Sequence, residues 1–261
     1  MKAKVIAVAN QKGGSGKTAA TLSLGVALSM HGKRVLLVDA DPQGDLTKSL
    51  GLGDPDSIET TIASHIENIV NDTPLNPHDG IVRSDENVDL MPANIRLADT
   101  EASLFLAMNR ERILSTWLTD LKSDYDYVLI DCMPSLGMLP VNALAAADSV
   151  LITVSAEYLP AIAMTALIRT IERVKRQINP ELAIEGALLT LFDKRTRIAR
   201  QVEKKIRNDY GSSMRVFETA IPRAVAASEA PAYGESIFTY DPEGKVAKAY
   251  KALCEEVLNH V

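Results

Sequence analysis

The sequence is poor in cysteine, and its two cysteines, Cys132 and Cys254, stand far apart. Their spacing matches no metal-ligand motif, and a chain of 261 residues can bury a core without disulfides or a metal. No apolar run approaches the roughly 20 residues of a membrane-spanning helix, and the N-terminus leads directly into an apolar segment instead of a secretory signal. We therefore expect reduced thiols and a cytoplasmic protein.

Positive charge is not in excess either. The net charge is −6, from 28 Lys and Arg against 34 Asp and Glu. This balance excludes a global field that attracts nucleic acid, so any DNA contact must come from a local basic patch.

Short apolar runs alternate with amphipathic segments along the chain. Strands that alternate with helices predict an α/β fold, a doubly wound and mostly parallel sheet flanked by helices. The polar stretch 54–89 predicts a helix with loops at the edge of the domain. Without internal repeats or a low-complexity linker, we expect a single domain over residues 1–261. The predicted strands are 5–9, 34–39, 127–131, 149–154 and 183–191, and the predicted helices are 18–30, 108–122, 136–147, 160–178, 195–210 and 242–259.

A glycine-rich segment joins the first predicted strand to the first predicted helix. Its glycines allow backbone N–H groups to converge on phosphate oxygens, and the helix adds its positive N-terminal end. Lys17 is expected to reach the β- and γ-phosphates, and Thr18 to ligate Mg²⁺. A chance Gly-Lys-Thr turn is the alternative, but the position between a buried strand and a helix favours a nucleotide site. The candidate nucleotide-binding residues are Lys12, Gly13, Gly14, Ser15, Gly16, Lys17, Thr18 and Ala19.

This loop departs from the usual pattern in one respect. A phosphate-binding loop normally has a glycine five positions before its last glycine. Here Gln11 fills that position and Lys12 the next, so the loop carries two lysines where one would hold a nucleotide. A solvated loop lysine is the simpler alternative for Lys12.

Acidic residues close two of the predicted strands. Asp131 ends the strand 127–131, the usual place for the acid that holds Mg²⁺ through water. Asp39 and Asp41 end the second strand at the carboxyl edge of the sheet, where ligands bind in such folds. One of these two acids could position or deprotonate the attacking water while the other steadies the metal shell. Without the glycine loop, an Asp-Pro turn would be the simpler interpretation.

Five segments together carry a resemblance to a known family. The segments 12–18, 38–44 and 129–137 read Lys-Gly-Gly-Ser-Gly-Lys-Thr, Val-Asp-Ala-Asp-Pro-Gln-Gly and Leu-Ile-Asp-Cys-Met-Pro-Ser-Leu-Gly, and 186–196 and 221–231 agree with them. They resemble the deviant Walker A P-loop ATPases, the MinD/ParA family, and are most similar to the ParA/Soj group of DNA-partitioning ATPases. The resemblance covers nearly the whole chain.

The resemblance implies ATP and Mg²⁺ as cofactors and a homodimer that closes face to face around two ATP molecules. Lys12 would reach across to the other subunit's phosphates and act in trans as an arginine finger does. The implied catalytic residues are Lys12, Lys17 and Asp41. The implied metal-side residues are Thr18, Asp39 and Asp131, and the residues near the adenine are Asp193, Pro222 and Arg223.

The resemblance also implies non-specific binding of double-stranded DNA, nucleoid association, and slow hydrolysis until a ParB-like, DNA-bound partner stimulates it. Phosphate contacts suffice for such binding and make it sensitive to salt. Arg195 and Arg223 fall near the family's DNA-contact positions, while Arg197, Arg200 and Lys204 share one face of a predicted helix. An ordinary solvated helix face is the alternative for these cations.

The sequence departs from the family pattern at two positions. Met133 replaces the first proline of Asp-Cys-Pro-Pro, which predicts a looser loop, and Ala226 replaces a second arginine, which removes one possible DNA contact. The chain also starts at the ATPase strand, so we expect no N-terminal helix-turn-helix extension and no operator reading through one.

Other functions of related proteins fit less well. A MinD-like membrane role would need a basic amphipathic tail, but in residues 245–261 the apolar stripe is more simply a core face. An iron–sulfur role would need paired cysteines, which Cys132 and Cys254 do not suggest. Small-molecule ligases share the fold, but nothing in the sequence marks a second substrate pocket.

Overall fold

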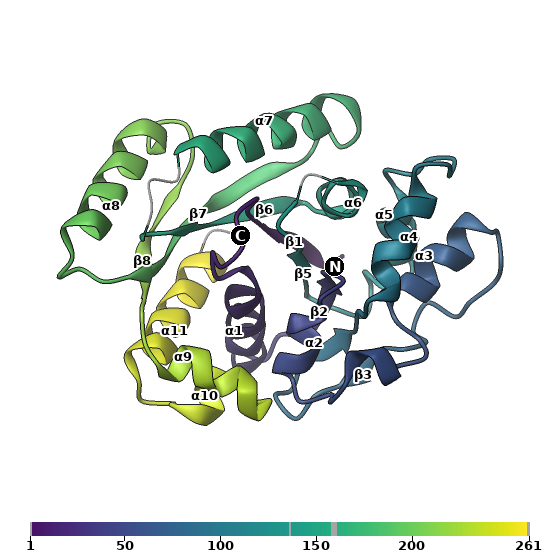
Figure 1. The fold of residues 1–261 in the computed structure, drawn as a ribbon, viewed down its shortest axis with the longest axis horizontal. Coiled ribbons are helices and arrows are strands. Elements are labelled where there is room, and N and C mark those ends of the chain that lie inside the picture. Colours follow the sequence, from purple (N-terminus) through teal and green to yellow (C-terminus); the bar gives the residue numbers. More distant parts are fainter. Residues whose placement is uncertain (1, 136, 158–160, 260–261) are drawn as a thin grey trace.

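A sheet of eight strands organises the chain in the computed structural model, which describes residues 2–135, 137–157 and 161–259. The strand order is β3-β4-β2-β5-β1-β6-β7-β8 (Figure 1). β3 runs antiparallel to β4, and the other neighbouring pairs are parallel. The strands are β1 (Lys4–Ala9), β2 (Val35–Ala40), β3 (Val82–Arg83), β4 (Asp89–Met91), β5 (Tyr127–Cys132), β6 (Ser149–Ser155), β7 (Ala183–Phe192) and β8 (Val216–Pro222).

Helices cover both faces of the sheet (Figure 1), and an apolar core lies between the sheet and the helices on each face. α1 (Lys17–Met30) and α11 (Lys245–Leu258) pack on one face. The opposite face is covered by α3 (Ile62–Val70), α4 (Arg96–Leu104), α5 (Ile113–Thr119), α6 (Met138–Ala146), α7 (Ala161–Gln177) and α8 (Arg197–Tyr210). The short elements are α2 (Asp45–Ser49), η1 (Pro55–Ser57), α9 (Ala226–Glu229), η2 (Ala230–Tyr233) and α10 (Ile237–Tyr240). This arrangement confirms the predicted doubly wound α/β fold.

The central strands place the glycine loop and the acids at one edge of the sheet. β1 lies between β5 and β6, and β2 lies on the other side of β5. Every residue of β2 and β5 is buried, as expected for parallel strands covered on both faces. Asp39 of β2 is paired in register with Asp131 of β5, so the two buried acids stand side by side.

The predicted strands are all present, but several other elements differ from the prediction. The helix predicted over 108–122 is confirmed only over Ile113–Thr119, which is α5, and its predicted start is wrong because Asn109 adopts a left-handed conformation with φ 52° that interrupts a helix. Elements α4, β4 and β8 were not anticipated. β8 is an edge strand that pairs with β7 alone, and its exposed Glu218 interrupts the apolar pattern.

Two predicted helix starts, at residues 136 and 160, lie outside the described residues. The predicted stop of the first helix is confirmed, because His31 is its C-cap and Gly32 has a positive φ of 74°. None of the helices in the described part of the chain is long and apolar enough to cross a membrane.

Candidate active site

The loop between β1 and α1 has the backbone of a phosphate cradle. Gly14 and Gly16 have φ values of 69° and 79°, which other residues rarely adopt, and Gly16 is the N-cap of α1. A β-carbon on Gly13 or Gly14 would meet no heavy atom within 4 Å, so the space over both glycines is open. The N-terminal end of a 14-residue helix therefore faces an open space that could take phosphate oxygens.

Side chains from two neighbouring strands fix this loop. The hydroxyl of Thr190 on β7 donates to the carbonyl oxygen of Ser15 at 2.8 Å. The hydroxyls of Ser15 and Thr153 on β6 lie 3.1 Å apart, and the amide of Asn10 donates to the Thr153 carbonyl. Asn10 Oδ1 in turn accepts from the backbone N–H of Lys12 at 2.9 Å. The loop is thus preorganised by β6 and β7.

The two loop lysines occupy different environments. Lys17 is 7% exposed, and its Nζ donates to the Lys12 carbonyl at 3.4 Å. Burial lowers the pKa of Lys17, although the nearby Asp131 carboxylate acts in the opposite direction. Lys12 lies on the exposed side of the loop and does not line the cleft described below. This placement leaves Lys17 directed inward and Lys12 at the surface.

Asp131 has the environment of a cation ligand. Both carboxylate oxygens are buried and accept no hydrogen bond from a described residue. Burial raises the pKa of Asp131 well above its ordinary value, and the neighbouring Asp39 raises it further. The Thr18 hydroxyl and the Lys17 ammonium lower the pKa of Asp131. The Thr18 hydroxyl does so from nearby, without the geometry of a hydrogen bond to either carboxylate oxygen. A magnesium ion would give these two oxygens a direct partner, so Asp131 and Thr18 fit a metal site.

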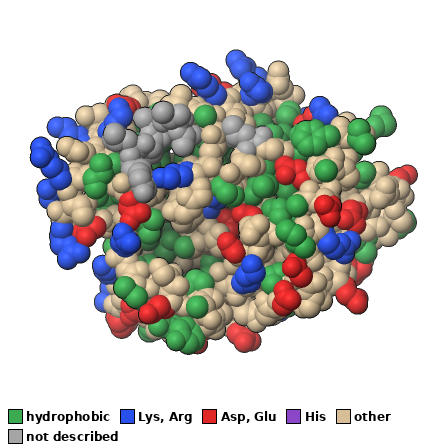
Figure 2. Space-filling model, viewed as in Figure 1, with side chains coloured by type: hydrophobic (Ala, Val, Ile, Leu, Met, Phe, Trp, Pro, Cys, Tyr) green, Lys and Arg blue, Asp and Glu red, His purple; other side chains and the backbone are tan. Residues whose placement is uncertain are grey.

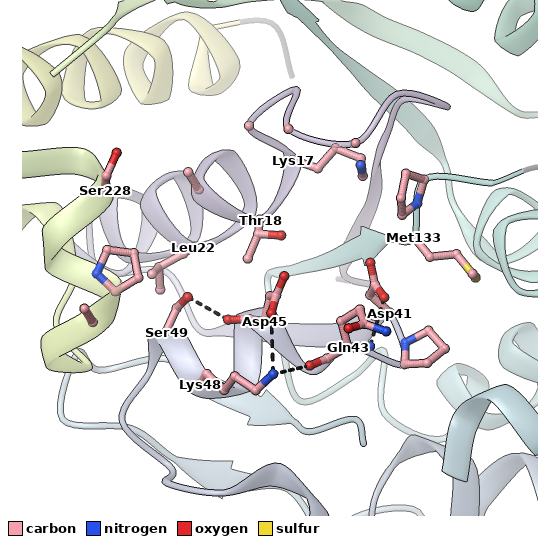
Figure 3. Close-up of a pocket in the computed structure, with 18 of the residues that line it drawn as sticks. Lys17, Thr18, Leu22, Asp41, Gln43, Asp45, Lys48, Ser49, Met133 and Ser228 are labelled. Atoms are coloured by element: carbon pink, nitrogen blue, oxygen red, sulfur yellow. Dashed lines mark hydrogen bonds and ion pairs between the residues drawn. The ribbon is translucent and has the colours of Figure 1, made fainter. Parts of the chain in front are cut away.

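Asp39 and Asp41 have different surroundings although they are only two residues apart. Asp39 is fully buried and hydrogen-bonded, and burial raises its pKa to about 6. Asp41 is half-buried and lines the cleft, where its Oδ1 accepts from the backbone N–H of Gln43 at 3.0 Å. Figure 3 shows Asp41 below Lys17 and Thr18, on the same open space. Only Asp41 of this pair can meet a water molecule in the cleft.

The cleft in front of the loop has a volume of about 1310 Å³. Residues 13–19 form one wall, and Asp41 with part of α2 forms another (Figure 3). Met133 also lines it, so the predicted departure from proline lies in the site itself. Sequence reasoning missed the far end of the cleft. Its residues there include Lys48, Ile95, Ala98, Ser228 and Tyr233.

The three residues predicted near the adenine lie together, but they do not line this cleft. Asp193 follows β7 and Arg223 follows β8, while Pro222 is paired in register with Phe192. The backbone N–H of Arg223 donates to the Phe192 carbonyl at 3.4 Å. These residues stand at the same edge of the sheet as Thr190, which contacts the glycine loop.

The five predicted DNA-contact cations separate into two groups. Arg195 forms a two-point ion pair with Asp193, with an Nη2–Oδ2 distance of 2.8 Å, and Arg223 pairs with Glu157. The Arg195 guanidinium lowers the pKa of Asp193 far below its usual range. The second group is Arg197, Arg200 and Lys204, whose side chains lie on the exposed face of α8.

No ion pair joins these three cations to an acid in the described residues, so no carboxylate within salt-bridge distance offsets their charge. Figure 2 shows Lys and Arg side chains gathered along the left edge of the molecule, where α8 lies.

The glycine loop between β1 and α1, Lys17 and the adjacent acid of β5 place this chain in the class of P-loop nucleoside triphosphatases. A family model described as an AAA domain matches residues 3–184. The chain is 42% identical to the sporulation initiation inhibitor protein Soj of Bacillus subtilis, over 97% of this chain and 98% of that protein. It is 39% identical to the chromosome partitioning protein ParA of Caulobacter vibrioides, over 98% of this chain and 94% of that protein. The chain belongs to the ParA/Soj family of P-loop ATPases.

Solved structures agree in fold. One is a cobyrinic acid a,c-diamide synthase from Mycobacterium smegmatis with a bound ATP analogue and magnesium, at 39% identity and a TM-score of 0.86, covering 99% of this chain and 95% of that one. Another is the cell division ATPase MinD of Pyrococcus furiosus, at 26% identity and a TM-score of 0.74, covering 99% of each chain.

Proposed function

We propose that this chain is an ATPase that binds ATP with Mg²⁺ and hydrolyses it to ADP and phosphate. The observation that carries the proposal is the pair of orphaned, buried oxygens of Asp131 beside the preorganised glycine loop. Backbone N–H groups of residues 13–19 would bind the phosphates, and Lys17 would neutralise the β- and γ-phosphates. Thr18 and Asp131 would hold the ion, which supplies charge stabilisation on the transferred phosphoryl group. Asp41 would orient or deprotonate the attacking water.

We propose that hydrolysis requires a homodimer formed with ATP. The exposed position of Lys12 supports this, because a lysine at the outer face of the loop can reach the phosphates of a second subunit. Such a contact exists only when two subunits and ATP are together, which makes assembly depend on the nucleotide. It would also add positive charge where negative charge develops in the transition state.

DNA binding without sequence preference is the third part of the proposal. Arg197, Arg200 and Lys204 of α8 support it, because these three cations face solvent and form no ion pair with an acid among the described residues. Arg195 and Arg223 would first have to exchange Asp193 and Glu157 for phosphate oxygens. Two copies of the surface in a dimer would bind more tightly than one.

In the cell, we propose a partitioning ATPase in the cytoplasm, associated with the nucleoid and built as one ATPase domain. The names of its relatives in Bacillus and Caulobacter support this role. Hydrolysis would be slow alone and would be stimulated by a ParB-like protein bound to the cargo DNA.

Two other functions follow from the relatives. A MinD-like membrane role has weak support, because Val246, Tyr250, Leu253 and Val257 of α11 are buried in the core and are not available to a lipid surface. A diamide synthase role, as in the name of the Mycobacterium relative, would require a corrinoid acid in the cleft beside the nucleotide. A second cavity, of about 320 Å³, lies away from the loop against His65 and Trp117.

A single experiment separates the partition role from the MinD-like membrane role. The purified chain is bound to non-specific double-stranded DNA without nucleotide, with ADP and with ATP, each with Mg²⁺ and across a salt series. We expect binding only with ATP, falling on the order of a thousandfold between about 50 and 200 mM salt if six or more phosphates are contacted. Lys17→Ala is the control that should not respond to ATP. Failure to bind DNA under all three nucleotide conditions would contradict the partition role. ATP-dependent binding to anionic vesicles instead of DNA would support the MinD-like role.

A further inference from the structure

The carboxylate of Asp39 accepts hydrogen bonds from the chain segment that carries Asp41. Its Oδ1 accepts the backbone N–H of Asp41 at 3.2 Å. Its Oδ2 accepts two hydrogen bonds from Thr47, one from the backbone N–H at 2.9 Å and one from the hydroxyl at 2.7 Å. Asp39 thus ties together the beginning and the end of the segment 41–47. This differs from Asp131, whose oxygens accept no hydrogen bond from the described residues.

Thr47 extends this network to a third part of the chain. The side chain is fully buried, and its hydroxyl accepts the backbone N–H of Ala93 at 3.1 Å while donating to Asp39. Ala93 precedes α4, so one hydroxyl joins the end of β2 to the turn after β4. Both the donor and the acceptor capacity of the hydroxyl are used, which only serine or threonine could reproduce at this position without a larger side chain.

A glycine fixes the middle of the same segment. Gly44 is buried with φ 63°, and a β-carbon there would lie 3.0 Å from the carbonyl oxygen of Ala93. The segment 41–47 therefore packs closely against Ala93 at Gly44 and accepts a hydrogen bond from the Ala93 N–H at Thr47. Asp41 lies between these contacts and Asp39, on the side of the segment that lines the cleft.

We propose that Thr47 and Asp39 are positioning residues that hold Asp41 at the nucleotide, and that Asp39 acts through these hydrogen bonds and not as a metal ligand. The proposal rests on the ATPase function proposed above. Without the Thr47 hydroxyl, the Ala93 N–H loses its partner and Asp39 loses its shortest hydrogen bond. The segment then relaxes, and Asp41 moves relative to a nucleotide that the glycine loop still holds. A displacement of about 1 Å in a catalytic group can reduce a rate on the order of a hundredfold.

Thr47→Val is the primary test, because valine keeps the shape of threonine and removes only the hydroxyl. Hydrogen–deuterium exchange of the nucleotide-free protein should show faster exchange in residues 40–48, with little change in the glycine loop. Thr100→Val is the matched control, because Thr100 is also buried, its hydroxyl is hydrogen-bonded to Glu67 and to the Arg96 carbonyl, and neither Thr100 nor Glu67 lines the cleft. Unchanged exchange in residues 40–48 of Thr47→Val would overturn the proposal. If Thr47→Val does not fold, Thr47→Ala repeats the test without a methyl group against Ala93.

Steady-state hydrolysis of Mg-ATP gives the second readout. For Thr47→Val we expect kcat to fall by about tenfold to a hundredfold, with the KM for ATP unchanged. Thr47→Ser should restore kcat, whereas Thr100→Val should leave both constants as in the wild type. Equal losses in Thr47→Val and Thr100→Val would show a general loss of stability and overturn the positioning role. A wild-type chain without ATPase activity would contradict the proposed function, while the exchange experiment would still decide whether Thr47 holds the segment.

Discussion

Asp131→Asn should stabilise the nucleotide-free protein and at the same time remove its response to magnesium. In the wild type, the two oxygens of Asp131 are buried beside Asp39 without hydrogen-bond partners, so ionisation of this carboxyl is costly in the folded protein. Asparagine removes this charge and keeps the shape of the side chain. The same change replaces a carboxylate, which can be negatively charged, by a neutral amide that attracts Mg²⁺ less, so the metal should no longer strengthen nucleotide binding.

The size of the effect follows from the burial of Asp131. A buried polar group without a partner costs about 1–3 kcal/mol, and a charge costs more. Asparagine removes the cost of burying a charge but keeps the cost of burying a polar amide. We therefore expect the free energy of unfolding to rise by about 1–3 kcal/mol, which is less than the full cost of a buried charge. For a chain of this size that corresponds to roughly 2–12 °C in Tm.

The gain should depend on pH with a definite sign. The pKa of Asp131 is raised in the folded protein, so the folded state holds this proton more tightly than the unfolded state does. The resulting contribution to the free energy of unfolding is complete below the ordinary pKa of an aspartate and is lost as the pH rises through the raised pKa. The Tm difference between Asp131→Asn and the wild type should therefore be smaller at about pH 5 than at about pH 7.5. Taking this difference cancels the opposite contribution of His65, whose pKa is lowered by burial.

Thermal unfolding at both pH values, with EDTA, with ADP and with Mg-ADP, measures these effects. Asp45→Asn is the matched control, because Asp45 is an exposed acid that lines the same cleft. It should change Tm little and keep the magnesium response. A lower Tm for Asp131→Asn in EDTA, or a magnesium response equal to that of the wild type, would refute the reasoning.

Other substitutions test the remaining roles. Lys12→Ala should retain ATP binding and lose the ATP-dependent dimer; a normal dimer in sedimentation would exclude the contact in trans. Asp41→Ala should lower turnover by about a hundredfold or more and trap the ATP form on DNA, and unimpaired phosphate release would rule out a catalytic role. Arg195→Glu combined with Arg223→Glu should abolish DNA retention while sparing dimerisation; unchanged retention would leave α8 alone as the DNA surface.

The parts of the molecule that the sequence predicts well are those where one local signal is decisive. The glycine loop and the buried strands around it have such signals, because parallel strands covered on both faces are continuously apolar. The far wall of the cleft has none. Ile95 contributes to it as the N-cap of α4, a helix whose polar sequence gives no clear helical signal. Tyr233 contributes from a segment more than 200 residues away from the loop. Tertiary packing brings these residues to the site.

The hydrogen bonds of Asp39 are a second limit of sequence reasoning. The spacing of Asp39 and Asp41 indicates two acids at one sheet edge, but it does not indicate which of them meets solvent. The structure separates them through Thr47, eight residues from Asp39, whose type alone carries no functional signal. Burial and hydrogen bonding thus distinguish two residues that the sequence presents as equivalent.

The position of β1 in the sheet has a consequence for how the chain folds. β1 is made before its two neighbours in the sheet, β5 and β6, which begin at Tyr127 and Ser149. The Thr190 hydroxyl that fixes the loop at Ser15 lies 175 residues along the chain. Contacts of such long range form late and slow the folding of a domain. During synthesis, the phosphate loop therefore leaves the ribosome before the strands that fix it, and it acquires its shape only after those strands have followed.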